Sequence, residues 1–198
     1  MTMIAVLGNG RVGGSLALAF ARAGHDVTVA DRSPGSAADA VRAAQIVVNA
    51  TPGAGSLERL VALREELRGK ILVDVSNATV DGPDGLPVGL LYPRSSLAEQ
   101  LQEALPGTHV VKTLNTMLYT VMTAPAALSQ TPTAFLSGTD PDAKQVVRGL
   151  LADLGWQQEW VTDLGGIVTA RAAEAAILFV PHVIRADGFA PFAVSITR

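Results

Sequence analysis

Residues 3–31 set apolar runs around a glycine-rich turn in an order that strongly limits the possible fold. The apolar run over 3–7 predicts a buried strand, and Gly8-Asn9-Gly10-Arg11-Val12-Gly13 follows it at once as a G-x-G-x-x-G turn. A helical pattern comes next, then a second predicted strand over 27–30 that ends at Asp31, roughly twenty residues after the turn. Strand, turn, helix, strand and acid in this order predict a dinucleotide-binding unit.

Each glycine of the turn has its own mechanical role. One permits a tight turn, one lets the backbone approach a pyrophosphate, and one lets the helix pack closely on the strand. The phosphates then rest on free N–H groups at the N-terminus of the helix. We therefore expect a pyrophosphate to bind the residues of this turn: Gly8, Asn9, Gly10, Arg11, Val12 and Gly13.

Three further predicted strands alternate with helical patterns and indicate a parallel, doubly wound sheet; they cover 45–50, 70–75 and 109–114. In such a sheet, ligands bind beyond the carboxyl ends of the strands. The residues that follow the strands are therefore expected to line one site. They are Asp31, Arg32 and Ser33; Ala50, Thr51 and Pro52; Ser76 and Asn77; and Asn115, Thr116 and Met117.

The end of the second strand bears on the choice between NAD and NADP. Asp31 would accept hydrogen bonds from the adenosine ribose and repel a 2′-phosphate, which favours NAD(H). Arg32 argues for NADP, because a guanidinium can bind that phosphate or stack on adenine; it could also be a solvated surface charge. The sequence leaves both cofactors open.

Polar side chains also follow the fifth predicted strand. Asn115 and Thr116 could hydrogen-bond a nicotinamide amide or a substrate carbonyl, and they could equally cap the next helix. We expect them to orient the reacting ring. Tyr119 is the one nearby phenol that could donate a proton, although its position also suits a buried helix face. Met117 and Met122 are expected to fill the core.

The rest of the chain contains further strand and helix patterns. Helices are expected over about 11–23, 35–43, 56–67 with Ser56 as the N-cap, 95–105, 141–154 with Thr139 or Asp140 as the N-cap, and 166–181. Strands are expected over 133–137, at a sheet edge over 157–161, and at the end of the chain over 192–196. Segment 76–93, rich in glycine and proline, is expected to be a long loop, either a surface excursion or a flap over a ligand.

Together these patterns predict an α/β fold, with a Rossmann-like, doubly wound, mainly parallel sheet, a small C-terminal helical extension and a closing strand. Residues 1–198 are interpreted as a single NAD(P)-binding domain. Its dinucleotide-binding core covers about 1–162, and the C-terminal helix and strand cover about 163–198.

The composition excludes several classes of site and partner. The chain has no cysteine, which excludes disulfides, thiolate metal sites and cysteine nucleophiles. Its three histidines, His25, His109 and His182, are not spaced as a metal-ligand set, so no metal is expected. The net charge is −3 and no basic block is present, so a nucleic acid is not an expected partner.

The sequence also favours a cytoplasmic protein without a membrane partner. No secretory signal precedes the first strand. The most apolar late run, 175–180, follows Glu174, is too short to span a bilayer, and is expected to stop at Pro181.

No histidine or serine is placed as an acid, base or nucleophile, so we expect hydride transfer that depends on proximity and alignment. The leading hypothesis is an NAD(P)-dependent oxidoreductase acting on a small molecule: a deazaflavin, a flavin, or a small carbonyl or imine compound. The alternative is a dinucleotide-binding protein without turnover, either a redox sensor or a pathway enzyme that has lost hydride chemistry.

Four segments of the chain resemble the coenzyme F-420-dependent NADP oxidoreductases and their dinucleotide-binding relatives. The N-terminal domains of the six-transmembrane metalloreductases share the fold and the motif after the fifth strand. The similarity covers nearly the whole chain and is carried by Val6 to Gly13; Lys112-Thr113-Leu114-Asn115-Thr116; Leu164-Gly165-Gly166 with Ala170-Arg171 and Glu174; and Phe192-Ala193-Val194.

The resemblance implies a homodimer that passes hydride between NADP and a second redox ring, with coenzyme F-420 or a flavin as the second substrate. Two features depart from the family pattern. Asp31 stands where NADP-specific members carry a small polar residue, and Thr51-Pro52-Gly53 lacks the aromatic residue that often follows this proline. Arg171 and Glu174 are interpreted as a structural ion pair that fixes the last helix.

Overall fold

In the computed structural model, which describes residues 1–30, 33 and 35–196, a seven-stranded sheet has the order β2-β1-β3-β4-β7-β8-β9. Every pairing in it is parallel except that of β7 with β8. Its strands are β1 (Met3–Leu7), β2 (Asp26–Ala30), β3 (Ile46–Asn49), β4 (Ile71–Asp74), β7 (His109–Lys112), β8 (Ala134–Gly138) and β9 (Val161–Gly165). The expected mainly parallel sheet is confirmed.

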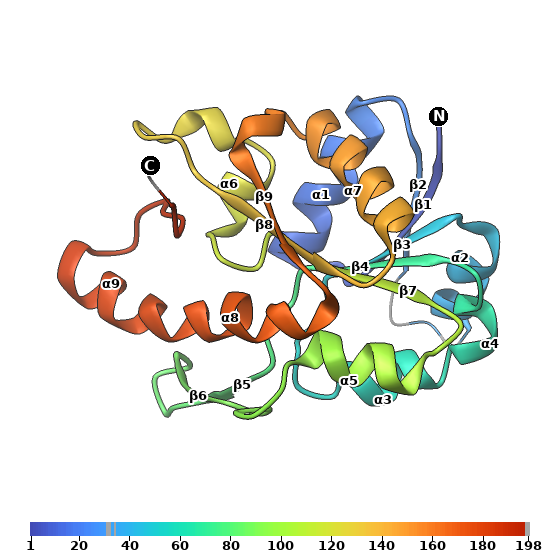
Figure 1. Cartoon of the computed structure of the whole chain (residues 1–198), viewed down its shortest axis with the longest axis horizontal. Coiled ribbons are helices and arrows are strands. Elements are labelled where there is room, and N and C mark those ends of the chain that lie inside the picture. The colour runs from blue at the N-terminus through green and yellow to red at the C-terminus, as the bar shows by residue number, and fades with distance from the viewer. Residues whose placement is uncertain (31–32, 34, 197–198) are drawn as a thin grey trace.

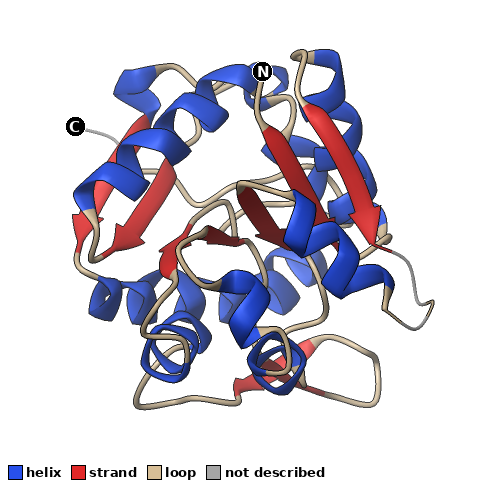
Figure 2. Cartoon of the chain, turned by 90° about the vertical axis from the view of Figure 1, so that its right-hand side faces the viewer, coloured by secondary structure: helices blue, strands red, loops and turns tan. Residues whose placement is uncertain are grey.

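Helices cover both faces of this sheet (Figures 1 and 2). Alternate residues of β1 supply the two cores: Ile4 and Val6 point to one face, and Ala5 and Leu7 point to the other. The first face packs against α1 (Arg11–Arg22), α6 (Tyr119–Met122) and α7 (Pro141–Asp153). The second packs against α2 (Ser36–Ala43), α3 (Ser56–Val61), α4 (Arg64–Leu67), α5 (Leu97–Ala104) and α8 (Ala170–Ala175).

The strand order places a switch point between β1 and β3. The chain leaves β1 for β2 on one side, then crosses to β3 on the other side of β1. The loops at the carboxyl ends of β1 and β3 therefore diverge, and this is where a doubly wound sheet opens a crevice for a ligand.

The N-cap predicted from the sequence is present at the start of α7 but not at the start of α3. The carboxylate of Asp140 accepts a 2.8 Å hydrogen bond from the Ala143 amide, and Pro141 occupies the first turn, as expected. Ser56 is not the N-cap that was predicted. It is the first residue of α3, after Gly55, and its hydroxyl accepts a 2.8 Å bond from Asn49 Nδ2 instead. The helix predicted over 56–67 is divided into α3 and α4.

Segment 76–93 contains a β-hairpin that the sequence did not reveal. Strands β5 (Thr79–Asp81) and β6 (Pro87–Leu90) pair antiparallel and flank a turn in which Gly85 has φ +74°. Glycine and proline interrupt the alternation of apolar and polar residues in these short strands, so the sequence pattern did not indicate them. The hairpin packs against the C-terminal helix, where Arg185 Nη2 lies 3.3 Å from Asp84 Oδ2.

The edge strand lies later in the chain than predicted. Most of 157–161 forms a 3-10 turn, η2 (Gln158–Trp160), and β9 begins only at Val161, which pairs with Ala134. Residues 157–159 are polar and exposed, so they have no apolar side chains to bury against the sheet. Strand pairing therefore starts at Val161, which is buried.

The C-terminal helix is longer than predicted. It runs through η3 (Ile167–Thr169), α8, η4 (Ala176–Phe179) and α9 (Val180–Asp187). Pro181 does not stop it, because this proline sits in the first turn of α9, where a missing N–H is tolerated. By length and composition alone, the helix over 167–187, which contains an 18-residue window of mean hydropathy 1.6, could cross a membrane; it extends well beyond the run 175–180 that was judged too short. Within this fold its small residues Ala170 and Ala173 are buried, whereas Phe179 is exposed.

The final segment is held by scattered hydrogen bonds and forms no closing strand within the described residues. Ala193 makes an isolated antiparallel bridge to Met117, with Leu118 N donating to Phe192 O and Val194 N donating to Thr116 O. The predicted strand over 192–196 is therefore reduced to one bridge.

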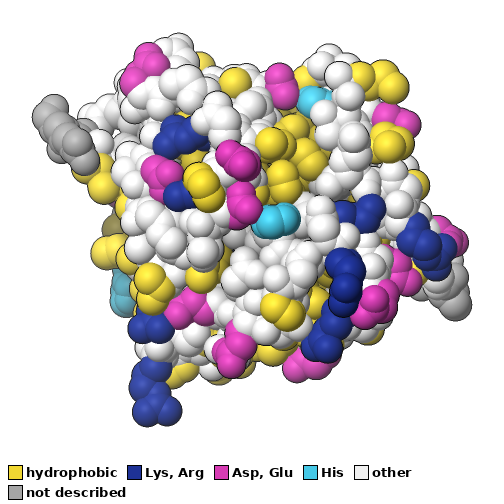
Figure 3. All heavy atoms as spheres, turned by 45° about the vertical axis from the view of Figure 1, so that its right-hand side comes forward, with side chains coloured by type: hydrophobic (Ala, Val, Ile, Leu, Met, Phe, Trp, Pro, Cys, Tyr) yellow, Lys and Arg dark blue, Asp and Glu magenta, His cyan; other side chains and the backbone are white. Residues whose placement is uncertain are grey.

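A short turn, η1 (Pro125–Ala127), completes the described elements. On the face drawn in Figure 3, acidic and basic side chains lie interspersed.

Arg171 pairs across helices and not along its own helix. Its guanidinium forms two parallel bonds to Glu99 of α5, Nε to Oε2 at 2.8 Å and Nη2 to Oε1 at 2.6 Å. Glu99 also bonds the hydroxyl of the α5 N-cap, Ser96. The predicted Arg171–Glu174 pair is therefore wrong: Glu174 is buried in the core and pairs with Lys112 instead.

We predict opposite effects on stability for alanine at two neighbouring glycines of α1. A Cβ on Gly13 would lie 1.9 Å from the Gly8 carbonyl oxygen, whereas a Cβ on Gly14 meets nothing within 4 Å. Gly13→Ala should lower the free energy of unfolding by about 1–3 kcal/mol, and Gly14→Ala should raise it by up to about 1 kcal/mol. Urea denaturation of both variants measures this. Equal stability of the two would contradict the close contact.

The Glu99–Arg171 pair predicts an acid-dependent loss of stability. The Arg171 hydrogen bonds hold the pKa of the Glu99 carboxyl below its ordinary value. Ionised Glu99 thus stabilises the fold above a pH of about 4.3, and this contribution disappears as the pH falls through the lower folded-state pKa. In urea denaturation, the wild type should exceed Arg171→Met in stability at pH 6, and the difference should shrink toward pH 3. Arg94→Met, at an exposed residue without an ion pair in the described structure, is the control.

Candidate functional site

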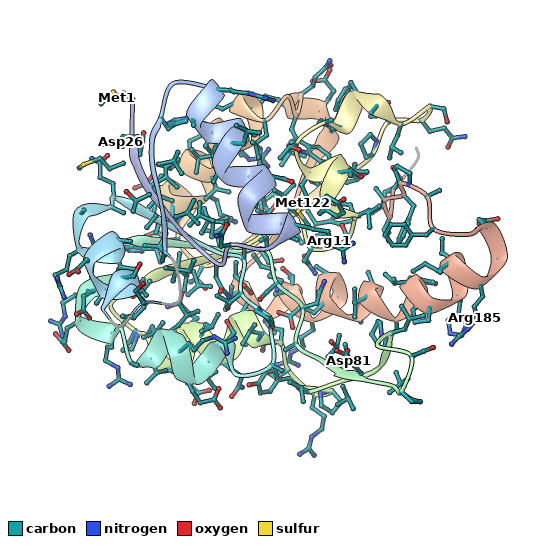
Figure 4. The ribbon with its side chains drawn as sticks, turned by 180° about the vertical axis from the view of Figure 1, so that it is seen from behind. Met1, Arg11, Asp26, Asp81, Met122 and Arg185 are labelled. Carbon is teal, nitrogen blue, oxygen red and sulfur yellow. The ribbon has the colours of Figure 1, made fainter. Side chains whose placement is uncertain are left out.

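A cavity of about 1340 Å³ opens at the carboxyl ends of the central strands. It extends from Ala30 and Ala37 near β2, past the glycine-rich turn, to the C-terminal helix at Ile177 and Val180. Sites for a single small molecule have volumes of roughly 300–1,000 Å³, so this cavity has room for more than one ligand. Figure 4 shows Arg11, at the start of α1, beside Met122 of α6; both line the cavity.

The glycine-rich turn presents bare backbone to this cavity. Gly8 has φ +111°, and a Cβ there would lie 2.6 Å from the Ala50 carbonyl oxygen. Gly10 is the N-cap of α1 and offers no side chain to the first amides of the helix. A Cβ on Gly10 would meet nothing within 4 Å, so the space in front of these amides is open. Unpaired amides at a helix N-terminus facing an open space fit a pyrophosphate.

The loop after β3 forms the next part of the wall and is held from behind. Asn49 is fully buried; its Oδ1 accepts a 2.7 Å bond from the Thr51 hydroxyl, and its Nδ2 donates to Asp74 Oδ1 at 2.8 Å. Arg59 of α3 lines the cavity and donates to Ala54 O at 3.0 Å and to Pro52 O. Neither Arg59 nor Asn49 is among the site residues predicted from the sequence.

Two asparagines join the ends of β4 and β7 at the cavity wall. Asn115 Nδ2 donates to Asn77 Oδ1, and Asn77 Nδ2 donates to Asn115 O, both at 2.9 Å. Asn115 Nδ2 also donates to Ala173 O of α8 at 2.9 Å. Its Oδ1 is buried and has no hydrogen-bond partner among the described residues, so one acceptor at the cavity wall is left unsatisfied.

The chain is strained where it leaves β7 to present Asn115. Leu114 has φ +60°, a left-handed conformation that is costly for a bulky side chain, and it is buried. Thr116, two residues on, is buried behind the wall and does not line the cavity. Its hydroxyl has no partner among the described residues. The backbone at 114 thus turns Asn115 toward the cavity and Thr116 away from it.

Behind the wall lies a group of three buried charges, Asp74, Lys112 and Glu174, which we call the buried triad. Lys112 Nζ is 2.8 Å from Asp74 Oδ2 and 3.0 Å from Glu174 Oε1, and all three side chains are almost inaccessible. Burial by itself lowers the pKa of the Lys112 ammonium, but the charges and hydrogen bonds of Asp74 and Glu174 outweigh it and raise that pKa. The Lys112 ammonium therefore stays charged in the neutral pH range.

The half of the cavity beyond the asparagines is apolar. Its lining residues are Met117, Leu118, Met122, Ile177, Val180 and Phe192. We call this half the apolar compartment. Tyr119 also lines it, and the Arg11 guanidinium lies 5.5 Å from the centre of the Tyr119 ring, in cation–π contact. Met117 and Met122 are buried, as predicted for core residues, and also contribute to this surface.

The structure brings most of the sequence-predicted site residues to the cavity wall. These are Gly8, Asn9, Gly10, Arg11, Val12, Ala50, Thr51, Pro52, Asn77 and Asn115. Gly13, Ser33 and Thr116 do not line it; Gly13 instead packs under Gly8. Asp31 and Arg32 lie outside the described residues. No cluster of His, Asp and Glu suited to a metal occurs in the part of the chain that the structure describes.

Comparison with known proteins agrees with this architecture. The model of the family "NADP oxidoreductase coenzyme F420-dependent" matches residues 3–78, which include the glycine-rich turn and the ends of β3 and β4. No protein among those with curated annotation matches. An imine reductase from Myxococcus stipitatus, solved with NADP+, shares the fold at 21% identity and a TM-score of 0.66; the match covers 91% of this chain and 61% of that one.

Two solved structures match over most of their length. A hypothetical protein of Sinorhizobium meliloti, SMa0349, is 29% identical with a TM-score of 0.66, covering 85% of this chain and 88% of that one. A candidate F420-dependent NADP reductase from Arthrobacter sp. FB24 is 39% identical with a TM-score of 0.91, and the match covers 100% of both chains. The chain thus belongs to the family of NADP oxidoreductases described as coenzyme F420-dependent.

Proposed function

We propose that the protein transfers a hydride between a nicotinamide cofactor, NADP(H) or NAD(H), and a second small molecule bound in the same cavity. The observation that carries this proposal is the continuity of one cavity of about 1340 Å³, from the open glycine turn to the apolar compartment. One end suits a pyrophosphate and the other suits an uncharged ring, and hydride transfer requires the two reactants to meet.

Different residues of the cavity wall would hold different parts of the cofactor. The amides of the turn at 8–13 would bind the pyrophosphate. The free Oδ1 of Asn115 would accept a hydrogen bond from the carboxamide of the nicotinamide, while Asn77 and Ala173 hold the Asn115 side chain in place. When bound, the nicotinamide supplies the hydride, and the protein supplies its position relative to the acceptor.

The apolar compartment favours an acceptor with a flat or compact uncharged reacting part. A deazaflavin of the coenzyme F420 type, a flavin, and a small carbonyl or imine compound all meet this condition. Among the described lining residues of this compartment, Tyr119 is the side chain that could deliver a proton to a reduced acceptor. The acceptor otherwise takes its proton from water.

We predict that Gly10→Val abolishes cofactor binding without unfolding the protein. The protein leaves room for the new side chain, but that room is where the phosphates would lie. The Kd of NADPH and NADH, measured by nicotinamide fluorescence, should rise at least about hundredfold, because several charge-assisted bonds to amides are lost. Gly14→Val, four residues along the same helix and away from the cavity, is the matched control and should bind normally. Unchanged binding by Gly10→Val would place the cofactor elsewhere.

The reaction itself is tested with a panel of acceptors. Wild-type protein with NADPH or NADH should reduce at least one acceptor among deazaflavins, flavins, quinones, carbonyls and imines, and Gly10→Val should not. Tight cofactor binding with no oxidation by any acceptor would instead support the alternative, a dinucleotide-binding protein without turnover.

A further inference from the structure

The buried triad has no part in the proposed hydride transfer, yet it touches the back of the cavity wall. Ser76 lines the cavity, and its hydroxyl donates to Asp74 Oδ1 at 2.8 Å. The Lys112 ammonium donates to the Ser76 carbonyl oxygen. One residue therefore separates the three charges from the interior of the cavity.

This part of the wall faces the nicotinamide half of a dinucleotide, a placement that rests on the proposed function. With the pyrophosphate at the glycine turn, the adenosine lies toward β2, where Ala30 and Ala37 line the cavity. The sheet order puts β4 and β7 on the opposite side of the turn. The nicotinamide thus lies toward Asn77 and Asn115, beside Ser76.

The triad carries one net negative charge. Two carboxylates, Asp74 and Glu174, lie within 3.0 Å of a single ammonium, and they raise the pKa of that Lys112 ammonium against the effect of burial. The amides of Leu97 and Ala98, at the start of α5, donate to Glu174 at 2.9 and 3.1 Å and compensate that carboxylate in part. A charge surrounded by protein is weakly screened, so its effect extends to neighbouring groups.

We propose that the buried triad biases the site toward the oxidised cofactor. The oxidised nicotinamide ring carries a positive charge that the reduced ring lacks, so a negative charge behind the wall stabilises the oxidised form selectively. Glu174 and its partners are in this sense positioning and tuning residues that never contact the cofactor. The consequence is a site that binds the oxidised cofactor more tightly, relative to the reduced one, than the wall residues alone would.

The size of the bias follows from Coulomb's law. For unit charges about 10 Å apart at an effective dielectric constant of about 20, the interaction changes an equilibrium roughly tenfold. Glu174→Gln removes one negative charge and keeps the size of the side chain. It should therefore raise the ratio Kd(NADP+)/Kd(NADPH) by about tenfold over the wild type.

Calorimetric titration with NADP+ and NADPH, and with NAD+ and NADH in parallel, measures this ratio. Both constants come from one protein sample, so a smaller folded fraction cancels. The double variant Lys112→Met/Glu174→Gln again has one net negative charge, and its ratio should return toward the wild-type value. Glu99→Gln, which removes an α5 carboxylate that does not line the cavity, should leave the ratio unchanged. If Glu174→Gln does not fold, Asp74→Asn removes one negative charge from the same triad and replaces it in the test.

Two failures are distinguishable. An unchanged ratio in Glu174→Gln, or a ratio that the double variant does not restore, would overturn the inference while leaving the proposed function intact. Failure of the wild type to bind either form of the cofactor would overturn the proposed function and, with it, the inference.

Discussion

A lysine ammonium enclosed on all sides by protein must be neutralised, and the way Lys112 is neutralised organises much of this molecule. Its partners, Asp74 and Glu174, come from β4 and from the C-terminal helix, 38 and 62 residues away in the chain. Asp74 in turn accepts hydrogen bonds from Asn49 and Ser76, and Glu174 accepts hydrogen bonds from backbone amides of α5. Loss of one partner from such a buried pair typically costs about 3–5 kcal/mol, so these elements are fixed relative to one another.

The wall of the cavity depends on that arrangement. Ser76 is held by both Asp74 and Lys112, and Asn77 follows it directly to pair with Asn115. The left-handed backbone conformation of Leu114 costs energy. Such a conformation persists only where the packing around it leaves the chain no alternative. Asn115 lines the cavity in this arrangement, and its buried Oδ1 is left without a hydrogen-bond partner among the described residues.

The dinucleotide-binding part of the fold is readable from the sequence because its constraints are local. A glycine turn between a strand and a helix allows few alternatives, and strands such as β1 and β3 carry continuous apolar runs. The residues that follow these strands reach the cavity as expected, apart from Gly13, Ser33 and Thr116. Asp31 and Arg32 remain predictions.

The failures have a common physical origin in long-range contacts. Glu174 and Arg171 are three residues apart on one helix, which suggests a pair, but each has a stronger partner from another element. The strand misplaced at 157–161 and the missing strand at 192–196 both depended on edge pairing, which tertiary packing decides. Two signals for the triad were visible: Asp74 and Lys112 each interrupt an otherwise apolar strand, and charges in such positions are seldom left unpaired.

The two ends of the cavity come from separate stretches of the chain. Residues up to Asn77 build the nucleotide end, and residues from Asn115 onward build the apolar compartment. The family model covers only the first of these stretches. Under the proposed function, mutations at Ile177, Val180 or Phe192 would therefore change which second reactant is accepted without disturbing the glycine-rich turn. Relatives built on this plan are free to diverge in substrate while inheriting one way of holding the coenzyme.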